Sequence, residues 1–183
     1  NEGRILFEGR PVGAWSQALM GYLPEERGLY RKLYVEAQLV YLGRLKGLSS
    51  AEAHRQARYW LERLGLDRWR AHKTEALSKG MQQKLQFIAA VLHQPRLLIL
   101  DEPFSGLDPL NADLLQQIIA EFKDAGRTIL FASHRMEQVE QLCDDICLIA
   151  QGRILTAGPL REIKQRFGRN TVVLEFDGDG TFL

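Results

Sequence analysis

The chain has 183 residues, 45% hydrophobic and 26% charged, which is typical of a globular protein with one hydrophobic core. Its 24 Lys and Arg nearly balance its 23 Asp and Glu, and a net charge of +1 gives no reason to expect nucleic acid as a partner. No apolar run approaches the ~20 residues of a spanning helix. The two cysteines, Cys143 and Cys147, are too few for a disulfide framework or a four-ligand zinc site, and we expect both to be free, buried thiols.

The first half of the chain begins with two short apolar runs, which are followed by a helical block. Ile5–Phe7 and Met20–Leu23 are bounded by glycine or proline and are expected to be strands. Residues 28–94 have helical periodicity, and Ser49 begins a capping-box pattern, S-x-x-E, at the start of one helix. We expect another helix to begin at Ser78 and to bury one face, made of Met81, Leu85, Ile88, Ala89 and Leu92.

The second half alternates strands and helices. Leu97–Leu100 and Thr128–Ala132 are continuous apolar runs, typical of parallel strands covered on both faces. Between them, Asp108 and Pro109 mark the start of a helix with an expected buried stripe of Leu110, Leu114, Ile118 and Phe122. This order predicts an α/β fold with a parallel sheet and an inserted helical subdomain.

Shorter elements are expected after the second strand. Met136–Leu142 predicts a short helix. Two apolar runs, 146–150 and 153–157, flank Gln151-Gly152 and predict a hairpin. A last helix over Leu160–Phe167 and a strand over Thr171–Phe176 complete the prediction.

Polar residues follow both central strands. Asp101 and Glu102 come after the first, and Ser133 and His134 come after the second. In a parallel sheet these residues share one edge, where ligands bind. Asp101 is suited to hold Mg²⁺ through water, Glu102 to orient or deprotonate a water, and His134 to contact a terminal phosphate or to position that water. Singly, each is more often a solvated or structural side chain; together they predict a catalytic site.

The stretch "LSKGMQQK", residues 77–84, places Ser78 and Gly80 at the start of a helix. Open backbone amides and the positive end of the helix dipole make such a start suitable for an anion. Taken alone, an ordinary N-cap is the commoner role of such a serine.

The order and spacing of these segments resemble the nucleotide-binding subunit of an ABC transporter over about residues 4–167. Among ABC transporters, the chain resembles the ATPase subunits of bacterial ABC-2-type exporters, including the sodium and drug exporters. Several segments match family motifs: the Q-loop region (21–30), the signature (77–81), Walker B (97–101) with Glu102 as the catalytic glutamate, the D-loop (105–108) and the switch histidine, His134.

This resemblance implies a P-loop NTPase-like fold of the ABC ATPase type that binds ATP and Mg²⁺. It implies a dimer of ATPase subunits in which Ser78, Lys79, Gly80 and Met81 face the partner's ATP and Asp108 lies at the dimer seam. It also implies a separate membrane permease, with the subunit on the cytoplasmic face of the membrane and transport in the direction of export.

Three features depart from the family pattern. Lys79, Gly80 and Met81 stand where the signature has two glycines and a glutamine, and Glu25 stands where the Q-loop has glutamine. A carboxylate can bind Mg²⁺ but cannot donate a hydrogen bond. The chain also has no Gly-Lys dipeptide, whereas the phosphate loop, Walker A, requires Gly-x-x-x-x-Gly-Lys.

We therefore expect residues 1–167 to be a partial ABC ATPase domain without its Walker A region, inactive by itself, and residues 168–183 to begin a C-terminal extension. Two other classes stay open from the sequence. One is a soluble ABC-type ATPase that acts on the ribosome or DNA, and the other is a non-catalytic binding module.

Overall fold

The computed structural model describes residues 3–26 and 28–167, and these divide into two compact units at the boundary between Arg135 and Met136. The predicted strand over Thr171–Phe176 and the C-terminal extension over 168–183 lie outside the described residues.

The first unit is built around a parallel sheet, as predicted. Three strands lie in the order β3-β4-β5, with β4 in the centre. Leu23 pairs with Leu100, and Asp101 pairs with Ala132, so the three strands end at one edge. Their bounds are Met20–Leu23 for β3, Leu97–Asp101 for β4 and Thr128–Ala132 for β5.

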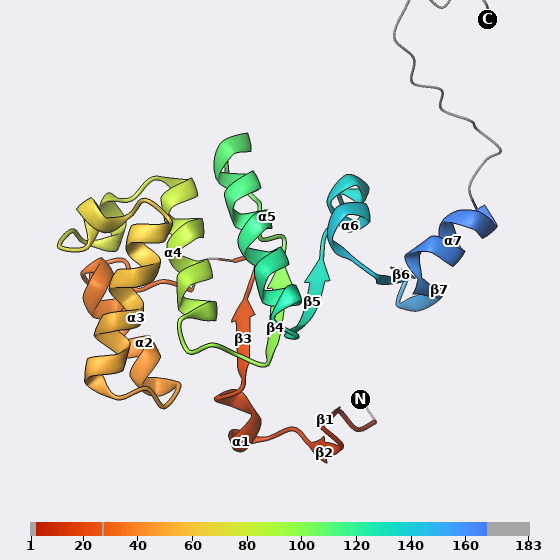
Figure 1. The fold of residues 1–183 in the computed structure, drawn as a ribbon, viewed down its shortest axis with the longest axis horizontal. Coiled ribbons are helices and arrows are strands. Elements are labelled where there is room, and N and C mark those ends of the chain that lie inside the picture. The colour runs from red at the N-terminus through yellow and green to blue at the C-terminus, as the bar shows by residue number, and fades with distance from the viewer. Residues whose placement is uncertain (1–2, 27, 168–183) are drawn as a thin grey trace, which may run out of the picture. The chain divides into compact units, whose positions relative to one another are not determined.

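The helical block expected over 28–94 is present. It contains α2 (Val35–Leu45), α3 (Ser50–Arg63), two short 3-10 helices (Asp67–Trp69 and Thr74–Ala76) and α4 (Lys79–Val91). Figure 1 shows α2 and α3 side by side, with α4 between them and the sheet. The helix α5 (Pro109–Asp124) connects β4 to β5. The chain before β3 forms a small hairpin, β1 (Leu6–Phe7) and β2 (Arg10–Pro11), and the short helix α1 (Ala14–Gln17).

The predicted helix boundaries follow from side-chain capping. Ser49 Oγ accepts the N–H of Glu52, and Ser78 Oγ accepts the N–H of Met81, each at 3.2 Å. Asp108 accepts the N–H of Asn111 at 2.9 Å, with Pro109 in the first turn of α5. Each cap satisfies an amide that the first helical turn leaves open, which is why the helices begin where the sequence indicates.

The burial predicted from the sequence is partly wrong. Leu110 is 79% exposed, and α5 buries the predicted Ile118 together with Leu115 and Ile119, which were not predicted. The helix α4 buries most of its circumference and not one stripe, because it packs against the sheet and against α2 and α3.

The sheet is also more open than predicted. On β4 only Leu98 and Leu100 are fully buried, and on β5 alternate residues, including Leu130, are exposed. Within the described part of the chain, β4 is thus buried on one face and half-buried on the other, whereas β5 is half-buried on one face and exposed on the other.

Gly21 lets β3 approach α4 closely. A Cβ on Gly21 would overlap the carbonyl oxygen of Ala90 and would lie 2.9 Å from Leu98 Cδ1. We expect Gly21→Ala to destabilise the protein by roughly 1–3 kcal/mol, because backbone and core atoms must move apart. Thermal melting should show a lower midpoint for this variant. Gly28→Ala is the control, since its Cβ meets nothing within 4 Å; equal midpoints for the two variants would contradict the packing argument.

His93 is buried where α4 meets the start of β3. Its Nε2 donates to the carbonyl oxygen of Met20 at 3.0 Å, and Lys46 Nζ donates to the same oxygen at 2.9 Å. Burial is the main cause that lowers the pKa of His93 to about 4, with a smaller contribution from Lys46 in the same direction, while the Met20 bond acts the opposite way. His93 is therefore neutral in the folded protein at neutral pH.

This histidine predicts a pH-dependent stability. Between pH 6.5 and about 4 the unfolded chain binds a proton at His93 and the folded chain does not, so stability falls as pH is lowered through this range. In His93→Gln, which keeps an amide donor for Met20, we expect urea denaturation midpoints to change less between pH 7 and pH 4.5 than in the wild type. The same substitution at His72, which is exposed, should leave the wild-type pH dependence unchanged.

The second unit contains α6 (Met136–Leu142), a hairpin of β6 (Asp145–Ala150) and β7 (Arg153–Pro159), and α7 (Leu160–Phe167). Gln151 and Gly152 both have positive φ, +50° and +72°, as the predicted tight hairpin turn requires. The expectation that both cysteines are buried is wrong, because Cys147 is exposed and Cys143 is half-buried.

Candidate functional site

The residues predicted to act together lie beyond the carboxyl ends of the strands. Asp101 ends β4, and the N–H of Glu102 extends the pairing by donating to the carbonyl oxygen of Ala132 at 3.0 Å. Ser133 and His134 follow β5 directly. The structure therefore brings Asp101, Glu102 and His134 to one edge, which is where open α/β sheets bind ligands.

Hydrogen bonds hold the carboxylate of Glu102 in place. Its Oε1 accepts the backbone N–H of His134 at 2.8 Å and lies 2.7 Å from Nδ1 of the same residue. Its Oε2 accepts the Ser133 hydroxyl at 3.2 Å. The Glu102 side chain is 17% exposed, whereas that of His134 is 82% exposed. With Nδ1 donating to Glu102, the histidine keeps Nε2 for a further partner.

The backbone of Glu102 adopts an uncommon conformation. Its φ is +45°, in the left-handed region that costs a non-glycine residue roughly 1–3 kcal/mol when the surroundings enforce it. Such conformations cluster at functional sites. Here the conformation accompanies the turn that aims the Glu102 carboxylate at the end of β5.

A second cluster forms around the start of α4. Ser78 and Lys79 are exposed, and Gly80 and Met81 are half-buried. A Cβ on Gly80 would lie 3.0 Å from the carbonyl oxygen of Gly106, so a glycine permits this close approach. The segment 77–81 thus packs against the turn 105–108.

Asn111 connects Asp108 to α4. Lys84 Nζ donates to Asn111 Oδ1 at 2.9 Å, and the Asn111 amide donates to Asp108 Oδ2 at 2.6 Å. The backbone N–H of Asn111, its side chain and the Lys84 charge together lower the pKa of Asp108. Burial lowers the pKa of Lys84, against the opposing effect of Asp108. Asp108 is therefore ionised at neutral pH and fixed beside the start of α4.

Glu25 lies on the exposed loop after β3, at the same end of the sheet. Gln86 on α4 holds this loop by donating to the carbonyl oxygens of Pro24 at 2.9 Å and Glu26 at 3.1 Å. Sequence reasoning missed this role, and it also missed Gln83, whose Nε2 donates to the carbonyl oxygen of Pro103 at 3.0 Å. The sequence does show two glutamines three residues apart within a predicted helix, but it does not show that they are buried or which groups they bond.

The residues at this edge suit a Mg²⁺ ion that takes most of its ligands from phosphates and waters and few from protein side chains. Among the described residues, no group of three or more His, Cys, Asp and Glu could hold a metal ion. Asp101 offers one carboxylate, while Glu102 is already engaged by Ser133 and His134. Mg²⁺ in nucleotide sites commonly uses one or two carboxylates and completes its shell with phosphates and waters, and Asp101 suits that role.

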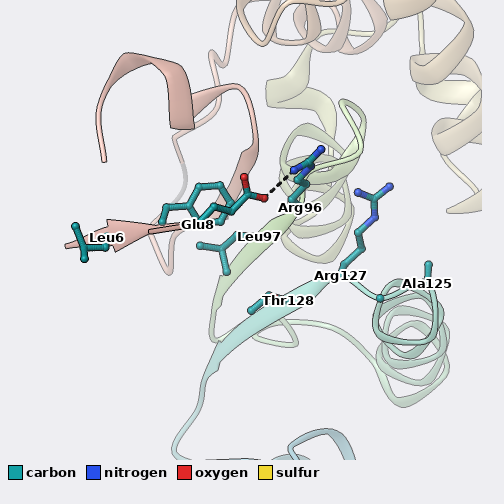
Figure 2. Close-up of a pocket in the computed structure, with 9 residues that line it drawn as sticks. Leu6, Glu8, Arg96, Leu97, Ala125, Arg127 and Thr128 are labelled. Atoms are coloured by element: carbon teal, nitrogen blue, oxygen red, sulfur yellow. Dashed lines mark hydrogen bonds and ion pairs between the residues drawn. The ribbon is translucent and has the colours of Figure 1, made fainter. Parts of the chain in front are cut away.

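One cavity lies at the opposite end of the sheet. It has a volume of about 460 Å³ and is lined by the β1 hairpin and by the starts of β4 and β5. Figure 2 shows Glu8 bonded to Arg96 at its side, with Arg127 nearby. The cavity lies at the amino ends of the strands and is therefore distinct from the Glu102 edge at their carboxyl ends, where parallel sheets bind ligands.

Comparison with known proteins agrees with this arrangement. A family model described as "ABC transporter" matches residues 1–105. The chain is 52% identical over 182 residues to the uncharacterized ABC transporter ATP-binding protein YhaQ of Bacillus subtilis (strain 168), covering 100% of this chain and 61% of YhaQ. It is 49% identical to the uncharacterized ABC transporter ATP-binding protein BpOF4_11395 of Alkalihalophilus pseudofirmus, covering 95% of this chain and 65% of the relative.

A solved structure described as the ATP binding subunit of an ABC transporter superposes with a TM-score of 0.77 and 36% identity, covering 83% of this chain and 63% of that one. The fold is thus the α/β fold of ABC ATPase subunits. The family match covers more than half of the chain, and the chain belongs to the ABC transporter ATP-binding family. It spans about three fifths of the length of the curated relatives named above. No helix in the described ranges is long and apolar enough to cross a membrane.

Proposed function

We propose that this chain is part of an ATP-hydrolysing subunit of an ABC transporter. The observation that supports this most strongly is the pair of Glu102 and His134, bonded at 2.7 Å beside Asp101 at the carboxyl edge of the sheet. Fold and family membership agree with this function, and the Glu102–His134 pair supplies groups that can carry out the hydrolysis.

In this proposal each residue at the edge has a separate task. Glu102 orients the attacking water and accepts its proton, for which a fixed carboxylate is suited. His134 donates from its exposed imidazole to the terminal phosphate, where negative charge must be stabilised. Asp101 holds Mg²⁺, which supplies charge neutralisation at the phosphates when bound.

The residues at the start of α4 act on a second subunit in this proposal. The exposure of Ser78 and Lys79 supports this, because both are accessible to a partner. Gly80 and Met81 complete this segment at the start of α4. Asp108, fixed by Asn111 and packed near this segment, would join the two subunits at their seam.

The loop after β3 leads to a surface suited to a membrane permease. Tyr30, Leu33, Tyr34 and Tyr41 are 41–53% exposed, and the rings of Tyr30 and Tyr41 are 6.2 Å apart. Exposed aromatic side chains in a group favour a protein partner. We propose that a separate permease docks beside Glu25, that the subunit lies on the cytoplasmic face of the membrane, and that transport is export, as the resemblance to ABC-2-type exporters implies.

The proposal is tested by comparing the 183-residue chain with the whole protein that contains it. We expect Mg²⁺-dependent ATP hydrolysis by the whole protein and none by the 183-residue chain, because the latter has no Gly-x-x-x-x-Gly-Lys to hold the phosphates. Phosphate release from ATP measures both. Turnover by the 183-residue chain that depends on Glu102 would contradict the need for that loop, and no ATP binding by the whole protein would contradict the proposed function.

A further inference from the structure

We propose that Gln83 is a positioning residue that keeps the Glu102 carboxylate aimed at His134. This inference rests on the proposed function, in which Glu102 activates water. Gln83 lies on α4 and is 2% exposed, so its amide is held by protein contacts and not by solvent. It touches neither His134 nor the Glu102 carboxylate in any bond described, and it would act through the backbone.

The contacts of Gln83 are with the segment that follows β4. Its Nε2 donates to the carbonyl oxygen of Pro103 at 3.0 Å and lies 3.5 Å from that of Glu102. The Glu102 carbonyl also accepts the N–H of Ser105 at 3.1 Å, so the particular contribution of Gln83 is to Pro103. Pro103 is buried, so its carbonyl oxygen needs a hydrogen-bond donor from the protein.

This bond matters because the backbone of Glu102 is in a strained conformation. A φ of +45° persists in a residue with a side chain only where neighbouring contacts over-determine it. The N–H of Glu102 is fixed by Ala132, the carbonyl of Glu102 by Ser105, and the carbonyl of Pro103 by Gln83. Without the Gln83 amide, the Pro103 carbonyl loses its donor, the turn that holds Glu102 at this φ is less restrained, and the carboxylate can turn away from His134.

A glutamine suits this position for a physical reason. A buried amide in an apolar helix is unfavourable unless its hydrogen bonds are made. Methionine matches its length without a donor, so this substitution separates the hydrogen bond from the packing. An ionised glutamate matches its shape without a donor and also adds a buried charge, so it is expected to lower kcat at least as much.

The test measures steady-state ATP hydrolysis by the whole protein with Gln83→Met, Gln82→Met and Glu102→Gln. We expect Gln83→Met to lower kcat about tenfold, because the free energy of one buried hydrogen bond corresponds to a change in rate of about this size. The KM for ATP should stay within twofold of the wild type. The control, Gln82, has a similar pair of bonds within the helical block, to the carbonyl oxygens of Leu77 at 2.9 Å and Thr74 at 3.5 Å. Gln82→Met should keep kcat within twofold of the wild type.

Each other outcome decides whether the role of Gln83 or the proposed function itself is overturned. A kcat for Gln83→Met within twofold of the wild type, while Glu102→Gln is inactive, overturns the role of Gln83 but not the proposed function. An equal loss in Gln82→Met also overturns it, because the effect then belongs to α4 as a whole. If Gln83→Met does not fold, Gln83→Glu at pH 8 is judged by the same criteria. Absence of turnover in the wild type contradicts the proposed function itself, and this inference with it.

Discussion

Glu102→Gln in the whole protein is expected to retain ATP and to accumulate as a dimer. The carboxamide keeps the size of the side chain, and its oxygen still accepts from His134, but it cannot take a proton from water. Loss of a general base typically costs roughly 10²–10⁴-fold in rate, so bound ATP should outlast the experiment. Size-exclusion chromatography with Mg²⁺ and ATP, followed by identification of the bound nucleotide, measures both effects.

The matched control for this variant is Glu52→Gln. Glu52 is on α3 in the helical block, where it pairs with Arg55 at 2.6 Å, away from the carboxyl edge of the sheet. This variant should elute as the wild type does. A monomeric Glu102→Gln protein that contains ADP would show that Glu102 is not the residue that activates water.

His134→Ala is expected to lower kcat by roughly a hundredfold with a smaller effect on ATP binding. The substitution removes the imidazole that lies 2.7 Å from Glu102 and is open to a phosphate on its other side. Loss of one donor to a developing negative charge costs about 10²–10³-fold in comparable sites. Steady-state kinetics of the whole protein, with nucleotide binding measured separately, gives the two effects.

His72→Ala controls for the loss of a histidine as such, since His72 is exposed in the helical block. We expect its kcat to stay within twofold of the wild type. His134→Gln keeps a donor near the same place and should fall between His134→Ala and the wild type. If His134→Ala turns over ATP at the wild-type rate, His134 does not contact the phosphate in the transition state.

The sequence was sufficient to predict the edge of the sheet. Apolar runs ending in Asp101-Glu102 and Ser133-His134 are local signals, and the parallel order of the strands then brings their ends together. Helix starts at Ser49, Ser78 and Asp108 were also predictable, because a cap depends on residues only three positions apart.

Burial and side-chain partners were less predictable, because they depend on packing between distant segments. Leu110 fits a helical stripe but lies in the first turn of α5, where nothing described covers it. In the sequence, Gln83 and Gln86 are polar residues among the apolar residues of a predicted helix. Their partners are carbonyl groups of Pro103 and Pro24, far from α4 in the sequence, which no local pattern indicates.

The central claim is that the edge formed by Asp101, Glu102 and His134 hydrolyses ATP. The most direct measurement is the release of inorganic phosphate from ATP by the whole protein, wild type and Glu102→Gln side by side, with and without Mg²⁺. The proposed mechanism predicts Mg²⁺-dependent turnover in the wild type and a loss of roughly 10²-fold or more in the variant. Equal turnover by the two proteins would contradict it.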